Sequence, residues 1–160
     1  MDDVAAMRLA IAEAEASPLL GDVPVGAIVL CAGEVVAKTH NEREFRSDPT
    51  AHAEILAIRA ASEVLGRSEL GDCTLVVTLE PCAMCAGALL AAGVGRLVFA
   101  AFDPKGGACG SRYNLLADPR IGLEITASAG VLEQQASEQL SAFFASLRDR
   151  SVRDLPAPGI

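Results

Sequence analysis

The stretch from residue 73 to residue 101 constrains the fold most, because strand-like and helix-like patterns alternate in it with very short links. The apolar run at 73–79 predicts a buried strand, and the small-residue segment at 83–92 predicts a helix that ends at Gly93. A second apolar run at 96–101 predicts another strand. Because so short a helical connection joins two strands as a right-handed parallel pair, we expect an α/β fold.

The rest of the chain adds strands and helices around this unit. Residues 25–31 and 34–39 are β-rich runs joined through Ala32 and Gly33, which predicts a hairpin of antiparallel strands. The other predicted elements are a first helix from Asp2 or Asp3 to Ser17 and Pro18, a helix from residue 53 to Gly66, a strand at 123–127 and an amphipathic helix at 133–147. Together they predict a three-layer α/β/α sandwich around a mixed five-stranded sheet.

Length and composition predict one domain without a membrane span. The 160 residues suit a single domain over 1–150, and 151–160 is expected to be a flexible C-terminal tail. Although 51% of the residues are hydrophobic, no apolar run is long enough to cross a bilayer or to form a secretory signal, so we expect a cytoplasmic protein. Five cysteines, two of them spaced C-x-x-C, then indicate metal or redox chemistry rather than a disulfide scaffold.

The formal net charge of −8 at pH 7 limits the partners that the chain can attract. A negative mean field repels phosphates, which argues against broad, non-specific binding to nucleic acid or to an anionic membrane. Any attraction to phosphate must then be local, and we expect a few basic side chains to gather at the mouth of a site. The candidates are Arg43, Arg46, Lys105 and Arg112.

Two short motifs, H-A-E at 52–54 and P-C-A-M-C at 81–85, carry residues that bind zinc. Cys82 and Cys85 lie three residues apart at a helix start, so both sulfur atoms face the same way and the helix dipole favours their thiolate form. With His52 they supply three of the four ligands that zinc prefers, which leaves one position open for water. Glu54 is then free to transfer protons in a hydrolytic deamination.

Taken alone, each motif also fits a simpler role. C-x-x-C before a helix is compatible with a redox pair of the thioredoxin type, and His52 with a core or helix-capping side chain. A purely structural zinc site would need a fourth ligand, and His40 is the only other histidine. Cys31 and Cys73 fall on predicted strands and are expected to be small core residues, whereas the role of Cys109 stays open.

Further segments accompany these motifs. They are V-P-V-G-A at 23–27, H-N at 40–41, D-P-T-A-H-A-E at 48–54, T-L-E-P-C-A-M-C-A-G-A at 78–88 and D-P-K-G-G-A-C-G-S at 103–111. With them the chain resembles the cytidine deaminase superfamily and, within it, the bacterial tRNA-specific adenosine deaminases. The resemblance implies a cytidine deaminase-like fold, a homodimer with one zinc ion (Zn2+) per subunit, and deamination of the wobble adenosine of a tRNA anticodon loop to inosine.

The resemblance also assigns roles at individual positions. It makes His52, Cys82 and Cys85 zinc ligands and Glu54 the proton shuttle, in agreement with the motifs themselves. Six further residues would bind substrate. Asn41 would read the base, and Val25, Gly26 and Ala27 would line the pocket wall. Asp103 and Lys105 would contact the neighbouring nucleotides.

Two other functions stay open. Guanine and cytosine deaminases share the zinc constellation, and a small neutral base suits an acidic protein, although the 103–111 loop resembles the tRNA enzymes specifically. A catalytically silent zinc-binding or tRNA-binding module is the second alternative. The intact Glu54 argues against it, because a module kept only for binding has no use for a proton shuttle.

Overall fold

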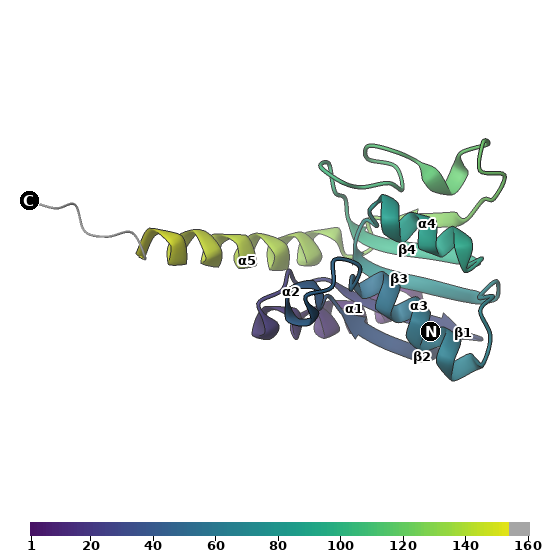
Figure 1. Ribbon diagram of the computed structural model, residues 1–160, viewed down its shortest axis with the longest axis horizontal. Helices are drawn as coiled ribbons and strands as arrows, with labels where there is room; N and C mark the ends of the chain where they lie inside the picture. The colour runs from purple at the N-terminus through teal and green to yellow at the C-terminus, as the bar shows by residue number, and fades with distance from the viewer. Residues whose placement is uncertain (154–160) are drawn as a thin grey trace, which may run out of the picture.

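One mixed β-sheet forms the centre of the protein (Figure 1). The computed structural model describes residues 1–153. The strands are β1 (Gly26–Cys31), β2 (Glu34–His40), β3 (Cys73–Leu79), β4 (Arg96–Ala101) and β5 (Thr126–Ala129). They lie in the order β2-β1-β3-β4-β5, with β1 antiparallel to both of its neighbours and with β3, β4 and β5 parallel. The parallel β3–β4 pair confirms the unit that the sequence predicted.

Helices cover both faces of the sheet, which confirms the predicted three-layer α/β/α sandwich. One core cluster contains most of the buried residues of α3 (Ala53–Leu65) and α4 (Ala83–Ala91). A second cluster contains buried residues of α1 (Asp3–Ala14) and α5 (Glu133–Arg153). Three shorter elements, α2 (Arg43–Arg46), η1 (Ser17–Leu20) and η2 (Leu115–Ala117), lie in the connections.

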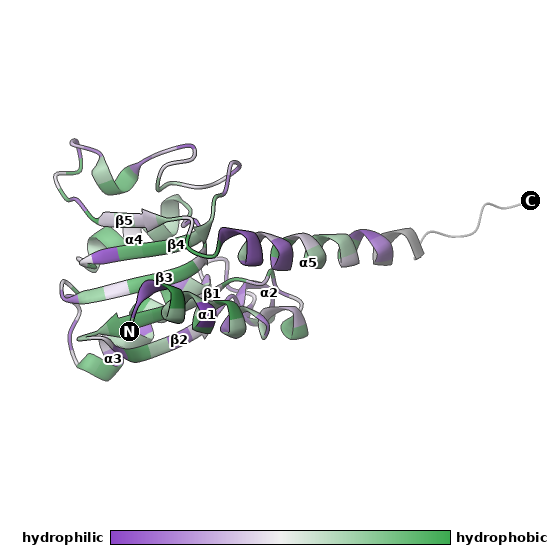
Figure 2. Cartoon of the chain, turned by 180° about the vertical axis from the view of Figure 1, so that it is seen from behind, coloured by the Kyte–Doolittle hydropathy of each residue, from purple (hydrophilic) through white to green (hydrophobic). Residues whose placement is uncertain are grey.

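The central strand β3 shows why the sheet is covered on both sides. Leu75 and Val77 belong to the cluster beneath α3 and α4, whereas Val76 between them belongs to the cluster beneath α1 and α5. Successive side chains of a strand point to opposite faces, so a run that is apolar throughout needs a helix layer on each face. Figure 2 shows the contrast between the hydrophobic central strands and α5, along which hydrophilic and hydrophobic segments alternate.

The last strand begins later than the sequence predicts. The expected strand at 123–127 is wrong in position, because β5 covers Thr126–Ala129 and pairs with β4 from Arg96 onward. Leu123 and Ile125 alternate like strand residues, but Leu123 is exposed, and Ile125 is buried where its backbone N–H donates to the Leu116 carbonyl. The apolar alternation therefore marks a loop anchored to η2 rather than a strand.

The C-terminal helix is longer than predicted. It continues to Arg153, beyond the expected end at 147, and its second half extends away from the sheet (Figure 1). The tail expected at 151–160 stays a prediction, since residues 154–160 lie outside the described part of the chain. Within residues 1–153, no helix has both the length and the apolar character that crossing a membrane requires.

Candidate active site

Two helix starts bring the predicted metal ligands together. His52 is the N-cap of α3 and Cys82 is the N-cap of α4, and neither side chain caps its own helix. The His52 Nδ1 atom lies 3.8 Å from the Cys82 Sγ atom and 3.6 Å from the Cys85 Sγ atom. The carboxyl end of β3 leads directly into α4, so the sheet fixes both sulfur atoms opposite the start of α3.

The three donor atoms fit a tetrahedral zinc ion. With zinc–sulfur and zinc–nitrogen bonds of about 2.3 and 2.0 Å, tetrahedral angles separate neighbouring ligand atoms by about 3.5 to 3.8 Å. The separations of 3.6 and 3.8 Å between the His52 nitrogen and the two sulfur atoms fall within this range. Two thiols and one imidazole are also the donor types that zinc selects, and a fourth position stays free for a reacting molecule.

Protonation at the two cysteines is strongly asymmetric. The hydrogen bond from the Cys85 thiol, together with His52, lowers the pKa of Cys82 to about 3, although burial acts against this. The same hydrogen bond and burial raise the pKa of Cys85. Cys82 is therefore a thiolate that shares the proton of Cys85, and a divalent cation bound there would replace this proton.

Glu54 lies in the first turn of α3 beside this donor set. Its side chain is 4% exposed, and burial raises its pKa, while the nearby His52 acts in the opposite direction. A carboxyl group with a raised pKa in a cleft is suited to accept a proton and to return it at neutral pH. Geometry and burial thus fit the role that the motif predicts for Glu54.

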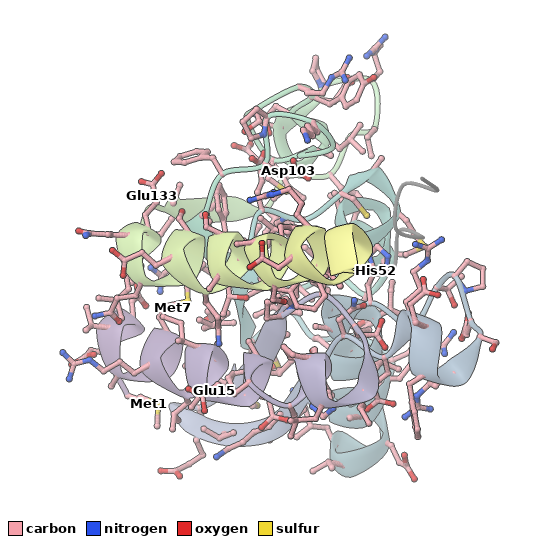
Figure 3. All side chains as sticks on the ribbon, turned by 90° about the vertical axis from the view of Figure 1, so that its left-hand side faces the viewer. Met1, Met7, Glu15, His52, Asp103 and Glu133 are labelled. Carbon is pink, nitrogen blue, oxygen red and sulfur yellow. The ribbon has the colours of Figure 1, made fainter. Side chains whose placement is uncertain are left out.

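A cleft of about 190 Å³ opens onto these residues. This volume is below that of sites for drug-sized ligands, so it suits a single flat ring system. His52 and Asp103, both labelled in Figure 3, are distant in the sequence but line the same cleft. Its lining consists of Val23, Val25, Asn41, Arg43, His52, Ala53, Glu54, Leu79, Glu80, Cys82 and Asp103.

Asn41 is buried at the cleft and is oriented by a residue that sequence reasoning missed. Its Nδ2 atom donates to the Asp22 carboxylate over 3.4 Å, and its Oδ1 atom has no hydrogen-bond partner. Asp22, only 1% exposed, also accepts from the backbone N–H groups of Glu44 and Phe45. A carboxylate accepts and does not donate, so Asp22 fixes which end of the Asn41 amide faces it and leaves the buried Oδ1 acceptor unpaired.

The three predicted wall residues differ in their surroundings. Val25 lines the cleft, whereas Gly26 and Ala27 are buried in β1 and are not among the lining residues. Gly26 has a packing reason of its own, because a Cβ atom there would lie 2.0 Å from the Ala10 carbonyl oxygen. Only glycine lets α1 approach the strand so closely.

A third buried carboxylate, Glu80, holds the glycine-rich loop at 103–111 against the site. It accepts hydrogen bonds from the backbone N–H groups of Asp103, Cys109 and Ser111, at 2.9 to 3.0 Å, and from the Ser111 hydroxyl. Burial raises the pKa of Glu80, but these hydrogen bonds outweigh it, so the pKa lies below its ordinary value. Glu80 therefore connects the loop to the segment that carries Cys82.

The loop brings only some of the predicted contacts to the cleft. Asp103 lines it, while Lys105 is exposed and lines a neighbouring groove against α5. Of the basic side chains expected at the mouth, Arg43 lines the cleft and Arg112 donates to the Lys105 carbonyl oxygen. Arg46 instead forms an ion pair with Glu42. The predicted gathering of positive charge is thus partial.

Comparison with known proteins identifies the family. Residues 1–148 match the MafB19-like deaminase family. The tRNA-specific adenosine deaminase of Bacillus subtilis is 46% identical over 144 residues, which cover 90% of this chain and 89% of that protein. A solved structure from work on A-to-I editing by tRNA:A34 deaminases has a TM-score of 0.82 at 39% identity, over 84% of this chain and 98% of its own.

A more distant relative has a different substrate. The structure of a guanine deaminase from Nitrosomonas europaea has a TM-score of 0.78 and 27% identity, over 89% of this chain and 84% of its own. The identity to the tRNA enzymes is therefore considerably higher over similar lengths. The chain belongs to the family of tRNA-specific adenosine deaminases.

Proposed function

We propose that the protein deaminates adenosine to inosine at the wobble position of a tRNA anticodon. The observation that carries this proposal is the cluster of His52, Cys82 and Cys85 beside a cleft that His52, Cys82 and the buried Glu54 line. The proposal is supported by the 46% identity to a tRNA-specific adenosine deaminase and by the likeness to an A34 deaminase structure.

In this proposal His52, Cys82 and Cys85 hold one zinc ion per subunit. Bound zinc would lower the pKa of a water molecule and so supply a nucleophile at neutral pH. Glu54 would move both protons of the attacking water in turn, the first to the ring nitrogen and the second to the leaving amine. The water oxygen stays on the ring carbon and the carbon–nitrogen bond breaks, so that ammonia departs. Its burial supports this role, because a carboxyl with a raised pKa both accepts and releases a proton at neutral pH.

Asn41 would read the flipped base. Its unpaired Oδ1 atom offers an acceptor, and the second N–H of its Nδ2 atom offers a donor to a purine edge. Asp22 holds the amide in this orientation at no cost when substrate binds, because the hydrogen bond is already present.

The groove beside the cleft suits the nucleotides next to the target. Its lining combines two basic side chains, two apolar ones and a serine: Lys105, Arg148, Leu140, Phe144 and Ser141. Phe144 is 44% exposed, and its ring meets that of Phe143 edge to face with centroids 5.4 Å apart. Exposed aromatic rings next to basic side chains bind single-stranded nucleic acid by stacking and by phosphate contact. We infer that the acidic chain attracts RNA locally, along this groove.

We further propose a homodimer that works in the cytoplasm. The helix α4 has an exposed face of small and apolar residues that would suit an interface: Ala83, Met84, Gly87 and Ala91. A Cβ atom at Gly87 would meet nothing within 4 Å in the protomer. Gly87→Arg should therefore preserve the fold and convert a dimer to a monomer in light scattering. A monomeric parent protein would contradict the dimer.

A deaminase of free guanine or cytosine is the second candidate function. The net charge of −8 favours it, since a neutral base needs no phosphate attraction, and the guanine deaminase fold is closely similar. The two candidates share the zinc chemistry and differ in substrate. An anticodon stem-loop with adenosine at the wobble position separates them, because only the tRNA enzyme converts that nucleotide to inosine.

The experiment incubates zinc-loaded protein with this stem-loop, digests the RNA to nucleosides and measures inosine by mass spectrometry. The matched control is a stem-loop in which the same adenosine stands one position away from the wobble position. The proposal predicts inosine from the first RNA only. Equal conversion of both RNAs would contradict recognition of the wobble position, and conversion of neither would contradict the RNA substrate itself.

A further inference from the structure

Two cysteines that have no part in the deaminase cleft face each other at the other end of the sheet. Cys31 ends β1 and Cys73 begins β3, and the two residues are direct partners in the antiparallel register. The cleft lies at the opposite end of β3, next to Leu79. Sequence reasoning expected both thiols to be small core residues, which holds for the buried Cys73 but not fully for the half-buried Cys31.

The hydrogen-bonding pattern of the strands brings the two side chains close. Cys73 donates its backbone N–H to the Leu70 carbonyl, outside the ladder, which marks Cys31 and Cys73 as a non-hydrogen-bonded pair. In such pairs the Cα atoms approach to about 4.5 Å and the side chains lie closer than in hydrogen-bonded pairs. The register of the sheet therefore holds the two thiols side by side.

A carboxylate completes a set of three ligand atoms. Asp72 places its Oδ2 atom 3.6 Å from the Cys31 Sγ atom and its Oδ1 atom 3.7 Å from the Cys73 Sγ atom. These two separations, each to a different carboxylate oxygen, are close to the 3.8 and 3.6 Å between the His52 nitrogen and its two sulfur atoms. The three ligand atoms all lie within 4.8 Å of one another.

A positive charge already lies against all three groups. The Arg67 Nη2 atom donates to the Asp72 carboxylate and lies 3.7 Å from the Cys31 Sγ atom and 4.0 Å from the Cys73 Sγ atom. Arg67 follows the C-cap of α3. Its side chain is 40% exposed, and the Asp72 side chain is 59% exposed. The guanidinium group can therefore swing into solvent and leave the three donors to another cation.

We propose that Cys31, Asp72 and Cys73 bind a second, thiophilic divalent cation of the zinc class, which displaces Arg67. Two thiolates and one carboxylate are ligands that zinc and cadmium accept, and a water molecule from the open side would be the fourth ligand. The ion would join the end of β1 to the start of β3 and stabilise the fold through its binding. Burial raises the pKa of Cys73 to about 12, so binding must release a proton from this thiol.

The test is a cadmium titration of zinc-loaded protein kept reduced by a phosphine. Thiolate-to-cadmium charge-transfer absorption reports binding, and zinc released into solution reports any exchange at the catalytic ligands. The control is the double variant Cys31→Ser and Cys73→Ser, which keeps the entire deaminase cleft and should retain the deamination rate of the parent. We expect one additional cadmium ion per chain in the parent protein and none in the variant. Equal titrations of the two proteins would overturn the proposal.

Two single variants test the ligand set without replacing the buried Cys73. Asp72→Asn removes one ligand and should weaken cadmium binding. Arg67→Ala removes the competing cation, and the loss of an exposed ion pair predicts binding about twofold to fivefold tighter. Weaker binding in Arg67→Ala would contradict displacement of the guanidinium group.

Discussion

Replacing Glu80 by glutamine tests whether one buried carboxylate holds the 103–111 loop at the cleft. Glutamine has nearly the same shape, but one of its terminal atoms donates instead of accepting. The Oε1 atom of Glu80 accepts from the backbone N–H groups of Cys109 and Ser111, and the Oε2 atom accepts from that of Asp103 and from the Ser111 hydroxyl. The hydroxyl can reverse its role and accept, so the amide nitrogen of glutamine should take the Oε2 position.

In this orientation one backbone N–H, that of Asp103, faces a donor and loses its partner. A hydrogen bond to a charged group contributes about 1.5 to 3 kcal/mol, so Glu80→Gln should lower the free energy of unfolding by about this amount. Glu80→Ala removes the partner of all three N–H groups and should cost more, about 4 kcal/mol. Because Asp103 lines the cleft, both variants should also lower kcat/KM on the stem-loop.

The assay is urea unfolding at a fixed zinc concentration, with the exposed Glu69→Gln as the matched control. The hydrogen bonds lower the pKa of Glu80, so its contribution is fully present above the ordinary glutamate pKa and is lost as pH falls through the lower folded value. The difference between parent and Glu80→Gln should therefore shrink in acid. A Glu80→Gln variant as stable as Glu69→Gln at neutral pH would refute the reasoning.

The other predictions concern the proton shuttle, the base-reading amide and one steric contact. Glu54→Gln should lower kcat about 10²- to 10⁴-fold while zinc stays bound, and loss of zinc would make Glu54 a ligand instead. Burial raises the pKa of Glu54, so the ionised side chain destabilises the metal-free fold above the ordinary glutamate pKa. Metal-free Glu54→Gln protein should therefore be more stable than the parent above that pH and equally stable below it. Urea unfolding in the presence of a chelator measures this difference. Asn41→Ala should lower kcat/KM. Asp22→Asn should lower kcat/KM much less in the Asn41→Ala background than in the parent protein. Additive effects of the two substitutions on kcat/KM would show that Asp22 does not act through Asn41. Gly26→Ala should destabilise the fold by more than 3 kcal/mol, roughly the upper range for single substitutions, because its Cβ meets the α1 backbone, and a neutral result in thermal unfolding would contradict this contact.

The cluster of three candidate metal ligands could be predicted from the sequence because local rules position its residues. His52 and Cys82 each stand at a helix start, and Cys85 follows one helical turn later, so their directions depend on helix geometry alone. The remaining step is that two helix starts meet at one end of the sheet. It follows because β1 is antiparallel to both β2 and β3, so the strands that precede α3 and α4 run in the same direction. Motif spacing and sheet topology together were sufficient to predict that these three side chains come together.

Two buried carboxylates, Asp22 and Glu80, could not be found in this way, because their partners are distant in the sequence. Asp22 bonds to the backbone at 44–45, and Glu80 bonds to a loop more than twenty residues later. In the sequence Asp22 looks like part of a turn beside Gly21, and Glu80 looks like the polar end of a strand. Burial alone distinguishes them, and burial of a charged group follows from long-range packing.

The error at the last strand has a similar cause. Leu123 and Ile125 show the alternation of a half-buried strand, which the sequence cannot distinguish from a loop fixed by one apolar residue. The ladder begins only at Thr126, where the backbone comes into register with Arg96 of β4. Pairing with a neighbour, rather than the pattern of apolar residues, sets the position of this edge strand.

The most direct test of the proposed activity is a competition between RNA and free base in one reaction. Zinc-loaded protein receives equal concentrations of guanine and of the anticodon stem-loop with wobble adenosine, and inosine and xanthine are measured over time. The account predicts inosine in the RNA with guanine left unchanged, and no product of either kind with Glu54→Gln. Xanthine formed while the RNA stays unedited would contradict the account, and would assign this cleft to a free-base deaminase.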